Sequence, residues 1–162
     1  MHPPVTFELI PVLDGPLLDE VRRLFQEYAD ALGVDLSFQD FAHELVTLPG
    51  DYAPPGGMLL LALVDRTAAG CVGVRRTDQT RCEMKRLFVR PPFQRTGCGR
   101  RLAERAIAWA SAVGYGQMLL DTLPTMTAAQ RMYEGLGFRD VPAYRFNPIA
   151  GTRFMARALT PA

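Results

Sequence analysis

Apolar and polar positions follow a helical period in the first third of the chain. Apolar residues recur every three or four positions over 17–32 and again over 37–48, and this spacing predicts two consecutive helices. Gly33 is a typical stop for the first helix, and Pro49 ends the second. A short apolar segment, 7–12, precedes both helices and predicts an initial strand.

The middle of the chain has the pattern of a sheet. Residues 58–64 are nearly all apolar, as in a strand that is covered on both faces. The segments 70–77 and 81–90 follow after short connections rich in turn-forming residues. We therefore expect these three strands to be antiparallel neighbours.

The last third of the chain alternates between the two periods. Helical spacing resumes over 100–113 and over 125–136, and a glycine follows each stretch. The segment 117–122 between them predicts a strand. The segments 138–146 and 152–159 predict a closing pair of strands. The expected order is strand, two helices, three strands, helix, strand, helix, two strands.

Length and composition narrow the protein class. The 162 residues suffice for a single domain, which we place over 1–162, and the net charge of +1 implies no strong field for nucleic acid or a membrane. No apolar run is long enough to span a bilayer, and the N-terminus lacks a secretory signal pattern. Cys71, Cys82 and Cys98 lack ligand spacing, so we expect reduced thiols, no metal and a cytoplasmic protein.

A glycine-containing turn joins the strand over 81–90 to the following helix. It reads Gln94-Arg95-Thr96-Gly97-Cys98-Gly99. Two glycines at such a turn let main-chain N–H groups gather around an anion, and the adjacent arginines favour a phosphate. A P-loop needs a lysine where Arg100 stands, and a dinucleotide fingerprint needs a glycine where Leu102 stands. A tight turn that binds no ligand is the other alternative.

Two blocks of the chain resemble the GNAT N-acetyltransferases. The stretch 87–99 is similar to the family's strand, proline and Gln/Arg-x-x-Gly-x-Gly/Ala loop before a long helix. The stretch 129–138 is similar to the family's later helix, with Tyr133 and the closing Gly137-Phe138. The resemblance implies an α/β fold with a mixed, mostly antiparallel sheet of about six to seven strands and about four flanking helices. At residue level it is confined to about 81–99 and 117–138.

The resemblance also implies a binding site for acetyl-CoA, without a metal. Main-chain amides of the loop would hold the CoA pyrophosphate, and the strand before it would pair with pantetheine. A main-chain N–H near Leu87 or Phe88 would hold the oxyanion. Cys98 is interpreted as a small hydrophobe, with a thiolate nucleophile as the alternative. The cofactor-binding residues implied are Leu87, Phe88, Val89, Gln94, Arg95, Thr96, Gly97, Cys98, Gly99 and Arg100.

Two residues are the catalytic candidates. Tyr133 matches the family's general acid, which protonates the CoA sulfur, although spacing alone favours a core tyrosine. Glu83 matches a glutamate that serves some members as general base; the alternatives are a surface residue of the strand or a contact to a cationic substrate. Met126 stands where many members have an asparagine.

The implied function is an acetyl-CoA-dependent N-acetyltransferase that acetylates a primary amine by direct attack. The acceptor, a small molecule or a peptide, is not identified by the sequence. GNAT proteins are often dimers, so a homodimer is one option, and the sequence leaves the oligomeric state open. The alternative is a non-catalytic CoA-binding or regulatory module. Aromatic residues that would line the acceptor site, though their spacing also suits a core, are Phe25, Tyr28, Phe38, Tyr52 and Tyr144.

Overall fold

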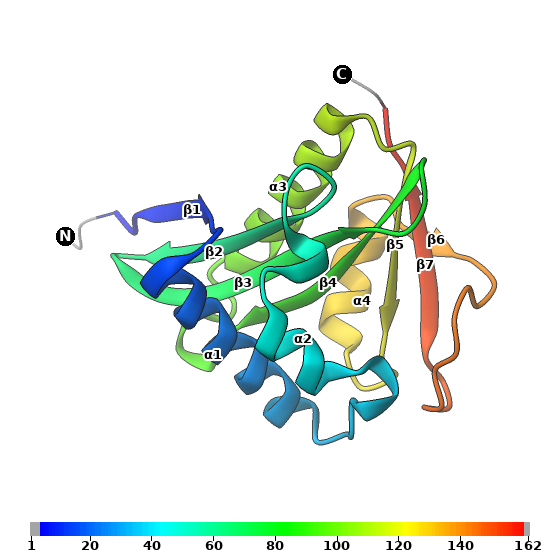
Figure 1. Cartoon of the computed structure of the whole chain (residues 1–162), viewed down its shortest axis with the longest axis horizontal. Coiled ribbons are helices and arrows are strands. Elements are labelled where there is room, and N and C mark those ends of the chain that lie inside the picture. The colour runs from blue at the N-terminus through cyan, green and yellow to red at the C-terminus, as the bar shows by residue number, and fades with distance from the viewer. Residues whose placement is uncertain (1–3, 161–162) are drawn as a thin grey trace.

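A seven-stranded mixed sheet organises the computed structural model, which describes residues 4–160 (Figure 1). The strands lie in the order β1-β2-β3-β4-β5-β7-β6, and all neighbours are antiparallel except β4 and β5. This confirms the expected fold class. The strands are β1 (Phe7–Pro11), β2 (Met58–Val64), β3 (Thr67–Arg76), β4 (Arg81–Val89), β5 (Gln117–Thr122), β6 (Arg139–Asp140) and β7 (Arg153–Ala158).

Helices pack on both faces of the sheet. One face carries α1 (Gly15–Leu32) and α2 (Phe41–Thr47), and the other carries α3 (Cys98–Val113) and α4 (Thr127–Gly135). The predicted helix over 37–48 is broken at Asp40, whose left-handed φ of 54° separates a short 3₁₀ turn from α2. None of the helices within residues 4–160 is both long and apolar enough to cross a membrane.

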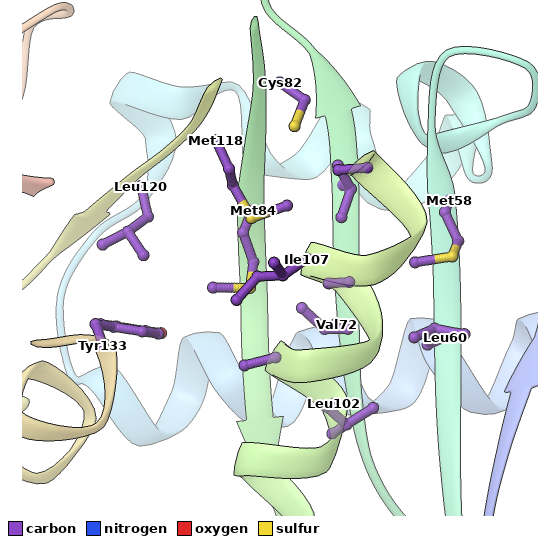
Figure 2. Close-up of a cluster of buried hydrophobic side chains, with 14 of the residues drawn as sticks. Met58, Leu60, Val72, Cys82, Met84, Leu102, Ile107, Met118, Leu120 and Tyr133 are labelled. Atoms are coloured by element: carbon purple, nitrogen blue, oxygen red, sulfur yellow. The ribbon is translucent and has the colours of Figure 1, made fainter. Parts of the chain in front are cut away.

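The hydrophobic core has two parts, one on each face of the sheet. Figure 2 shows the larger part, where α3 lies over β2, β3 and β4. The strand β2 contributes to both parts, because Leu60 faces α3 while Leu61 faces α1, and both are fully buried. This confirms the two-sided burial predicted for 58–64 and follows from the period of two in a strand.

The sheet opens between its two parallel strands. β4 and β5 pair only over 81–83 and 117–119, so residues 84–89 of β4 have no partner in β5. A register shift against β3 and the left-handed φ of 61° at Arg86 accompany this opening. The edge of β4 that faces β5 is therefore open over these residues, while its other edge stays paired with β3.

The predicted strand over 138–146 is wrong beyond its first residues. β6 contains only Arg139 and Asp140, and the chain over 141–152 is irregular. Pro142 has no N–H for a ladder. The side chains of Tyr144 and Arg145 instead turn to Glu83, and these contacts hold the segment across the sheet.

Candidate functional site

A cleft of about 580 Å³ lies at the free end of β4. The end of α1, the turn after β4 and the start of α4 form its other walls. The sequence-predicted loop and the strand before it thus face one cavity. Its lining residues are Tyr28, Ala31, Leu32, Leu87, Phe88, Val89, Phe93, Gln94, Arg95, Gly97, Gly99, Arg100, Met126, Ala128, Ala129 and Met132.

The loop before α3 presents unpaired main-chain donors. Gly97 caps the helix with a φ of 88°, which favours glycine. Among the described residues, the N–H groups of Gly97, Gly99 and Arg100 donate to no protein acceptor, whereas the N–H of Arg101 donates to the Gly97 carbonyl at 3.0 Å. Free N–H groups at the start of a 16-residue helix form an anion site.

Gly99 is not required by packing within the protein. A Cβ built there would lie 3.5 Å from Cγ2 of Val89, which is an ordinary contact, and its φ is not left-handed. The space in front of Gly99 belongs to the cleft. A side chain at this position would therefore fill space that a ligand would use.

The main chain of β4 offers two residues to the cleft. The Phe88 carbonyl points toward Gly70 of β3, and the Arg90 N–H donates to the Ala69 carbonyl at 2.8 Å. Because successive residues of a strand alternate, the main-chain groups of Leu87 and Val89 point away from β3. The N–H groups of Leu87 and Phe88 are the two candidates to hold an oxyanion, and that of Leu87 faces the opening of the sheet.

Cys98 is a small core residue. It is the first residue of α3, is 1 % exposed and packs in the larger part of the core. Burial raises the pKa of its thiol, against a smaller opposing effect of Arg101. These observations favour the interpretation as a hydrophobe over a thiolate nucleophile, because a reactive cysteine needs a lowered pKa.

Tyr133 projects from α4 toward β4 (Figure 2). Its ring packs edge-on against Phe138 at 5.8 Å between centroids, and the residue is 5 % exposed. Burial raises the pKa of the phenol, and Tyr28 and Asp121 raise it further. Tyr133 therefore keeps its proton at neutral pH, as a general acid must.

Asp121 is a carboxylate that sequence reasoning passed over as a site residue. It lies two residues beyond Leu119, the last β5 residue paired with β4, and so stands at the opening of the sheet. Its charge raises the pKa of Tyr133 and of Tyr144. The side chain is half-buried, and the Asn147 amide donates to it at 3.4 Å. Asp121 comes to this position through the parallel pairing of β5 with β4, which no sequence motif predicts.

Glu83 is the centre of a buried charged cluster and is itself fully buried. Its Oε1 accepts from Arg75 Nε at 3.1 Å and pairs with Arg145, while its Oε2 accepts from the Tyr144 hydroxyl at 2.6 Å. We call Glu83, Arg75, Lys85, Tyr144 and Arg145 the Glu83 cluster. Burial opposes ionisation of Glu83, but Lys85, Arg145 and Arg75 together hold the pKa of its carboxyl below the ordinary value. A carboxylate bound this firmly is a weak base.

Lys85 lies two residues along β4 from Glu83 and is 5 % exposed. Its Nζ donates to Gln39 Oε1 at 3.2 Å. Burial lowers the pKa of this amine to about 7, although Glu83 raises it. The next residue, Arg86, is satisfied separately, because Glu44 accepts from its Nε at 2.9 Å.

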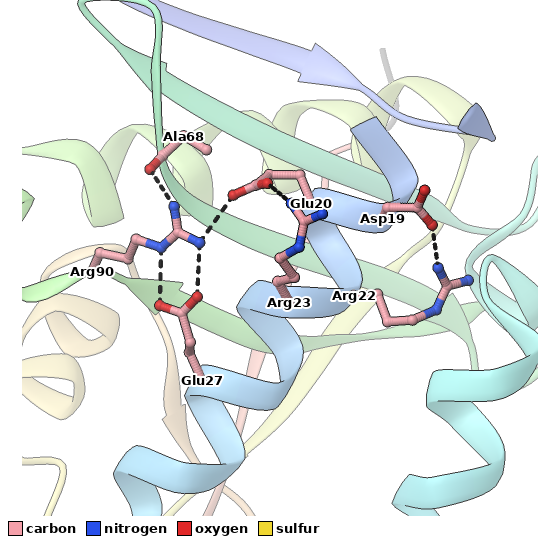
Figure 3. Close-up of polar contacts among 7 residues, drawn as sticks. All are labelled: Asp19, Glu20, Arg22, Arg23, Glu27, Ala68 and Arg90. Carbon is pink, nitrogen blue, oxygen red and sulfur yellow. Dashed lines mark hydrogen bonds and ion pairs between the residues drawn. The ribbon is translucent and has the colours of Figure 1, made fainter. Parts of the chain in front are cut away.

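Arg90 binds α1 to the end of β4 through its guanidinium (Figure 3). Directly after β4, its guanidinium donates to both oxygens of Glu27, at 2.9 and 2.7 Å, and to Glu20 at 2.9 Å, all on α1. A further N–H donates to the Ala68 carbonyl at 2.9 Å. α1 is thereby held against the end of β4, which brings Tyr28 to the cleft.

The remaining candidates for the acceptor site divide between the core, the cleft and the Glu83 cluster. Phe25 is fully buried, and Phe38 packs against the smaller part of the core. Tyr28 and Met126 line the cleft. Tyr144 belongs to the Glu83 cluster, as described above.

The chain is similar in sequence to acetyltransferases. The model of the acetyltransferase (GNAT) family matches residues 18–138. An uncharacterized N-acetyltransferase of Schizosaccharomyces pombe is 39 % identical over 140 residues, which cover 85 % of this chain and 86 % of the relative. The N-acetylaspartate synthetase of Rattus norvegicus is 31 % identical over 91 residues, which cover 56 % of this chain and 30 % of the relative.

The fold is also similar to that of a solved acetyltransferase. The PaiA N-acetyltransferase of Thermoplasma acidophilum, solved in complex with coenzyme A, superposes with a TM-score of 0.72 and covers 94 % of this chain and 99 % of that one. The two are 14 % identical, so this likeness concerns the fold alone.

Proposed function

The chain belongs to the GNAT family and is an N-acetyltransferase, and from this premise we propose that it moves an acetyl group from acetyl-CoA to a primary amine by direct attack. The observation that carries the proposal is the row of free N–H groups at Gly97, Gly99 and Arg100 beside the cleft. Acetyl-CoA supplies the acetyl group as a thioester.

The donor site would be formed mainly by main-chain groups. The free N–H groups at the start of α3 would bind the pyrophosphate, because the helix dipole favours an anion there. Leu87 and Val89 would bind pantetheine as an added strand does, since their main-chain groups face the opening of the sheet. Met126 lines the cleft with an apolar side chain where many family members have an amide.

The chemical step would use Leu87 and Tyr133. The N–H of Leu87 would stabilise the oxyanion that forms as the amine attacks the thioester carbon. Tyr133 would donate its proton to the departing sulfur. The phenol keeps its proton at neutral pH and so has one to donate, but its raised pKa makes the transfer less favourable. The proposal therefore rests on the position of Tyr133, whose ring projects from α4 toward β4.

The amine must lose a proton before or during its attack. The prediction that Glu83 accepts this proton stays a prediction, and the contacts of Glu83 favour a positioning role, since Arg75, Arg145 and Tyr144 already occupy its oxygens. We propose Asp121 as the acceptor of the proton, because it stands at the opening of the sheet and its charge reaches Tyr133.

The name of the Rattus norvegicus relative refers to an acetylated amino acid, and its match supports the reaction class for this chain. The test is free-thiol release from acetyl-CoA with a broad panel of primary amines. We expect at least one amine to release thiol at a saturable rate. Tight binding of acetyl-CoA with no thiol release from any amine would contradict the proposal and favour a binding module.

A further inference from the structure

The Glu83 cluster holds more positive charge than its single carboxylate balances. Arg75, Lys85 and Arg145 converge on Glu83, while the other buried arginine of β4, Arg86, has Glu44 as its own partner. The charge of Asp121 raises the pKa of Arg145 from the side of the opening. Within the described residues, however, no cation of the cluster donates a hydrogen bond to Asp121. Burying unbalanced charge is unfavourable. The cluster is therefore suited to an added anion.

The cations of the cluster also have unused donors. Within the described residues, Arg75 donates only through Nε to Glu83, and Arg145 pairs only through one terminal nitrogen. Lys85 donates only to Gln39. The side chains of Arg75 and Arg145 remain 25 % and 22 % exposed, so a ligand can reach them. Their free N–H groups match the two oxygens of a carboxylate.

A second observation comes from the neighbouring cavity of about 380 Å³, which Arg75, Gln39 and Tyr52 help to line. Tyr52 is 2 % exposed, and its hydroxyl has no hydrogen-bond partner within the described residues. A buried hydroxyl without a protein partner is rare, and a ligand with a polar group in this cavity could supply the missing partner. Asp40, Glu44 and Asp51 also line this cavity; Asp40 and Asp51 are exposed to solvent, and Glu44 is paired with Arg86.

The Glu83 cluster lies close to the proposed reaction centre along β4. Lys85 is two residues from Leu87 on β4, which corresponds to roughly 7 Å along a strand. Asp121 lies beside the opening, and its charge acts on both Tyr133 and Arg145. A small molecule can therefore present its amine near Asp121 and an anionic group to the cluster at the same time.

We propose that the acceptor is a small amino acid, whose amine is acetylated while its carboxylate is bound by Arg145 and Arg75 together with Lys85. This inference rests on the proposed function and specifies its acceptor. The reaction remains the one proposed above: the N–C bond forms, the thioester C–S bond breaks, and the amine proton leaves as the sulfur gains one. The carboxylate takes no part in the bond changes.

The first experiment compares matched acceptors in free-thiol release. Each amino acid is paired with its primary amide, for example glycine with glycinamide and L-alanine with L-alaninamide. We expect kcat/KM to be at least about tenfold higher for the acid, as for the loss of a charge-assisted hydrogen bond. The amide has the less basic amine and so more of the reactive neutral form, so basicity cannot produce this preference. Equal kcat/KM for acid and amide would overturn the inference and leave the proposed function standing.

The second experiment uses variants with a control from the same strand. Arg145→Gln and Arg75→Gln should reduce the preference for the acid toward one, through KM more than kcat. Arg76→Gln is the control, because Arg76 follows Arg75 but lies over the Tyr115 ring, 5.5 Å from its centroid, on the other face of the sheet. A preference that persists in both cluster variants would contradict the assignment of these arginines.

A third measurement does not depend on turnover. Succinate, a carboxylate without an amine, should raise the melting temperature of the wild type and of Arg76→Gln, and should have little effect on Arg145→Gln, because a ligand of the native state stabilises it. No rise in the wild type would overturn the anion site. If no amine gave thiol release while succinate still stabilised the wild type but not Arg145→Gln, the proposed acetyl transfer would be refuted. The carboxylate site would remain supported.

Discussion

The proposed donor side and the Glu83 cluster are built in opposite ways. The proposed donor side consists of the end of β4 and the loop before α3, over residues 87–100, and would act through main-chain groups. The cluster is assembled from side chains of β3, β4 and the 141–152 segment, and Tyr144 is 61 positions from Glu83. The first region depends on backbone shape and the second on particular side chains. Substitutions should therefore affect them differently.

The largest effect is expected for Glu83→Gln, which removes the only carboxylate that three buried or half-buried cations share. We expect the free energy of unfolding to fall by about 3 kcal/mol or more, since an uncompensated buried charge remains. Urea denaturation at pH 7 measures this change. The matched control is Glu104→Gln, which breaks an exposed pair with Arg100 at 2.8 Å and should cost less than about 0.5 kcal/mol. Similar losses in both variants would mean that the cluster does not stabilise the fold.

The same contrast explains what the sequence could reveal. The loop at 94–99 can be predicted from the sequence because glycine conformation and the start of a helix are local properties. The strand β2 can be predicted because its burial on both faces leaves no polar position. The irregular conformation of 141–152 cannot be predicted from the sequence, because contacts of Tyr144 and Arg145 with the distant Glu83 override the local strand pattern. The position of Asp121 at the opening of the sheet depends on the parallel pairing of β4 with β5, which joins segments separated by a whole helix.

The next effect concerns chemistry on the donor side. Tyr133→Phe should lower kcat by about a hundredfold, as for the loss of a general acid, while the dissociation constant of acetyl-CoA stays unchanged. The ring remains packed on Phe138, so the fold should not suffer. The measurements are steady-state thiol release and equilibrium binding of acetyl-CoA. Full activity in this variant would exclude Tyr133 as the acid.

A smaller effect is expected for the backbone of the donor loop. Gly99→Val should weaken acetyl-CoA binding about tenfold by occupying the cleft. Its melting temperature should change little, because the nearest atom to the new Cβ is 3.5 Å away. Gly97→Ala gives the contrast: a side chain at its φ of 88° is strained, so stability should fall by about 1 kcal/mol. Unchanged affinity in a folded Gly99→Val protein would remove the loop from the binding site.

The smallest effect tests the electrostatics of the cluster through Lys85. Burial lowers the pKa of its amine from 10.5 to about 7, so between these values the unfolded chain binds more protons at this site than the folded one. Stability from this group must then rise with pH across that window, by about 1 kcal/mol between pH 7 and pH 8. Lys85→Met keeps the apolar stem and removes the titration. Urea denaturation at both pH values should show a rise for the wild type that exceeds the rise for the variant. Equal rises would mean that Lys85 stays charged when buried, and that the Glu83 carboxylate balances the cluster more fully than its contacts indicate.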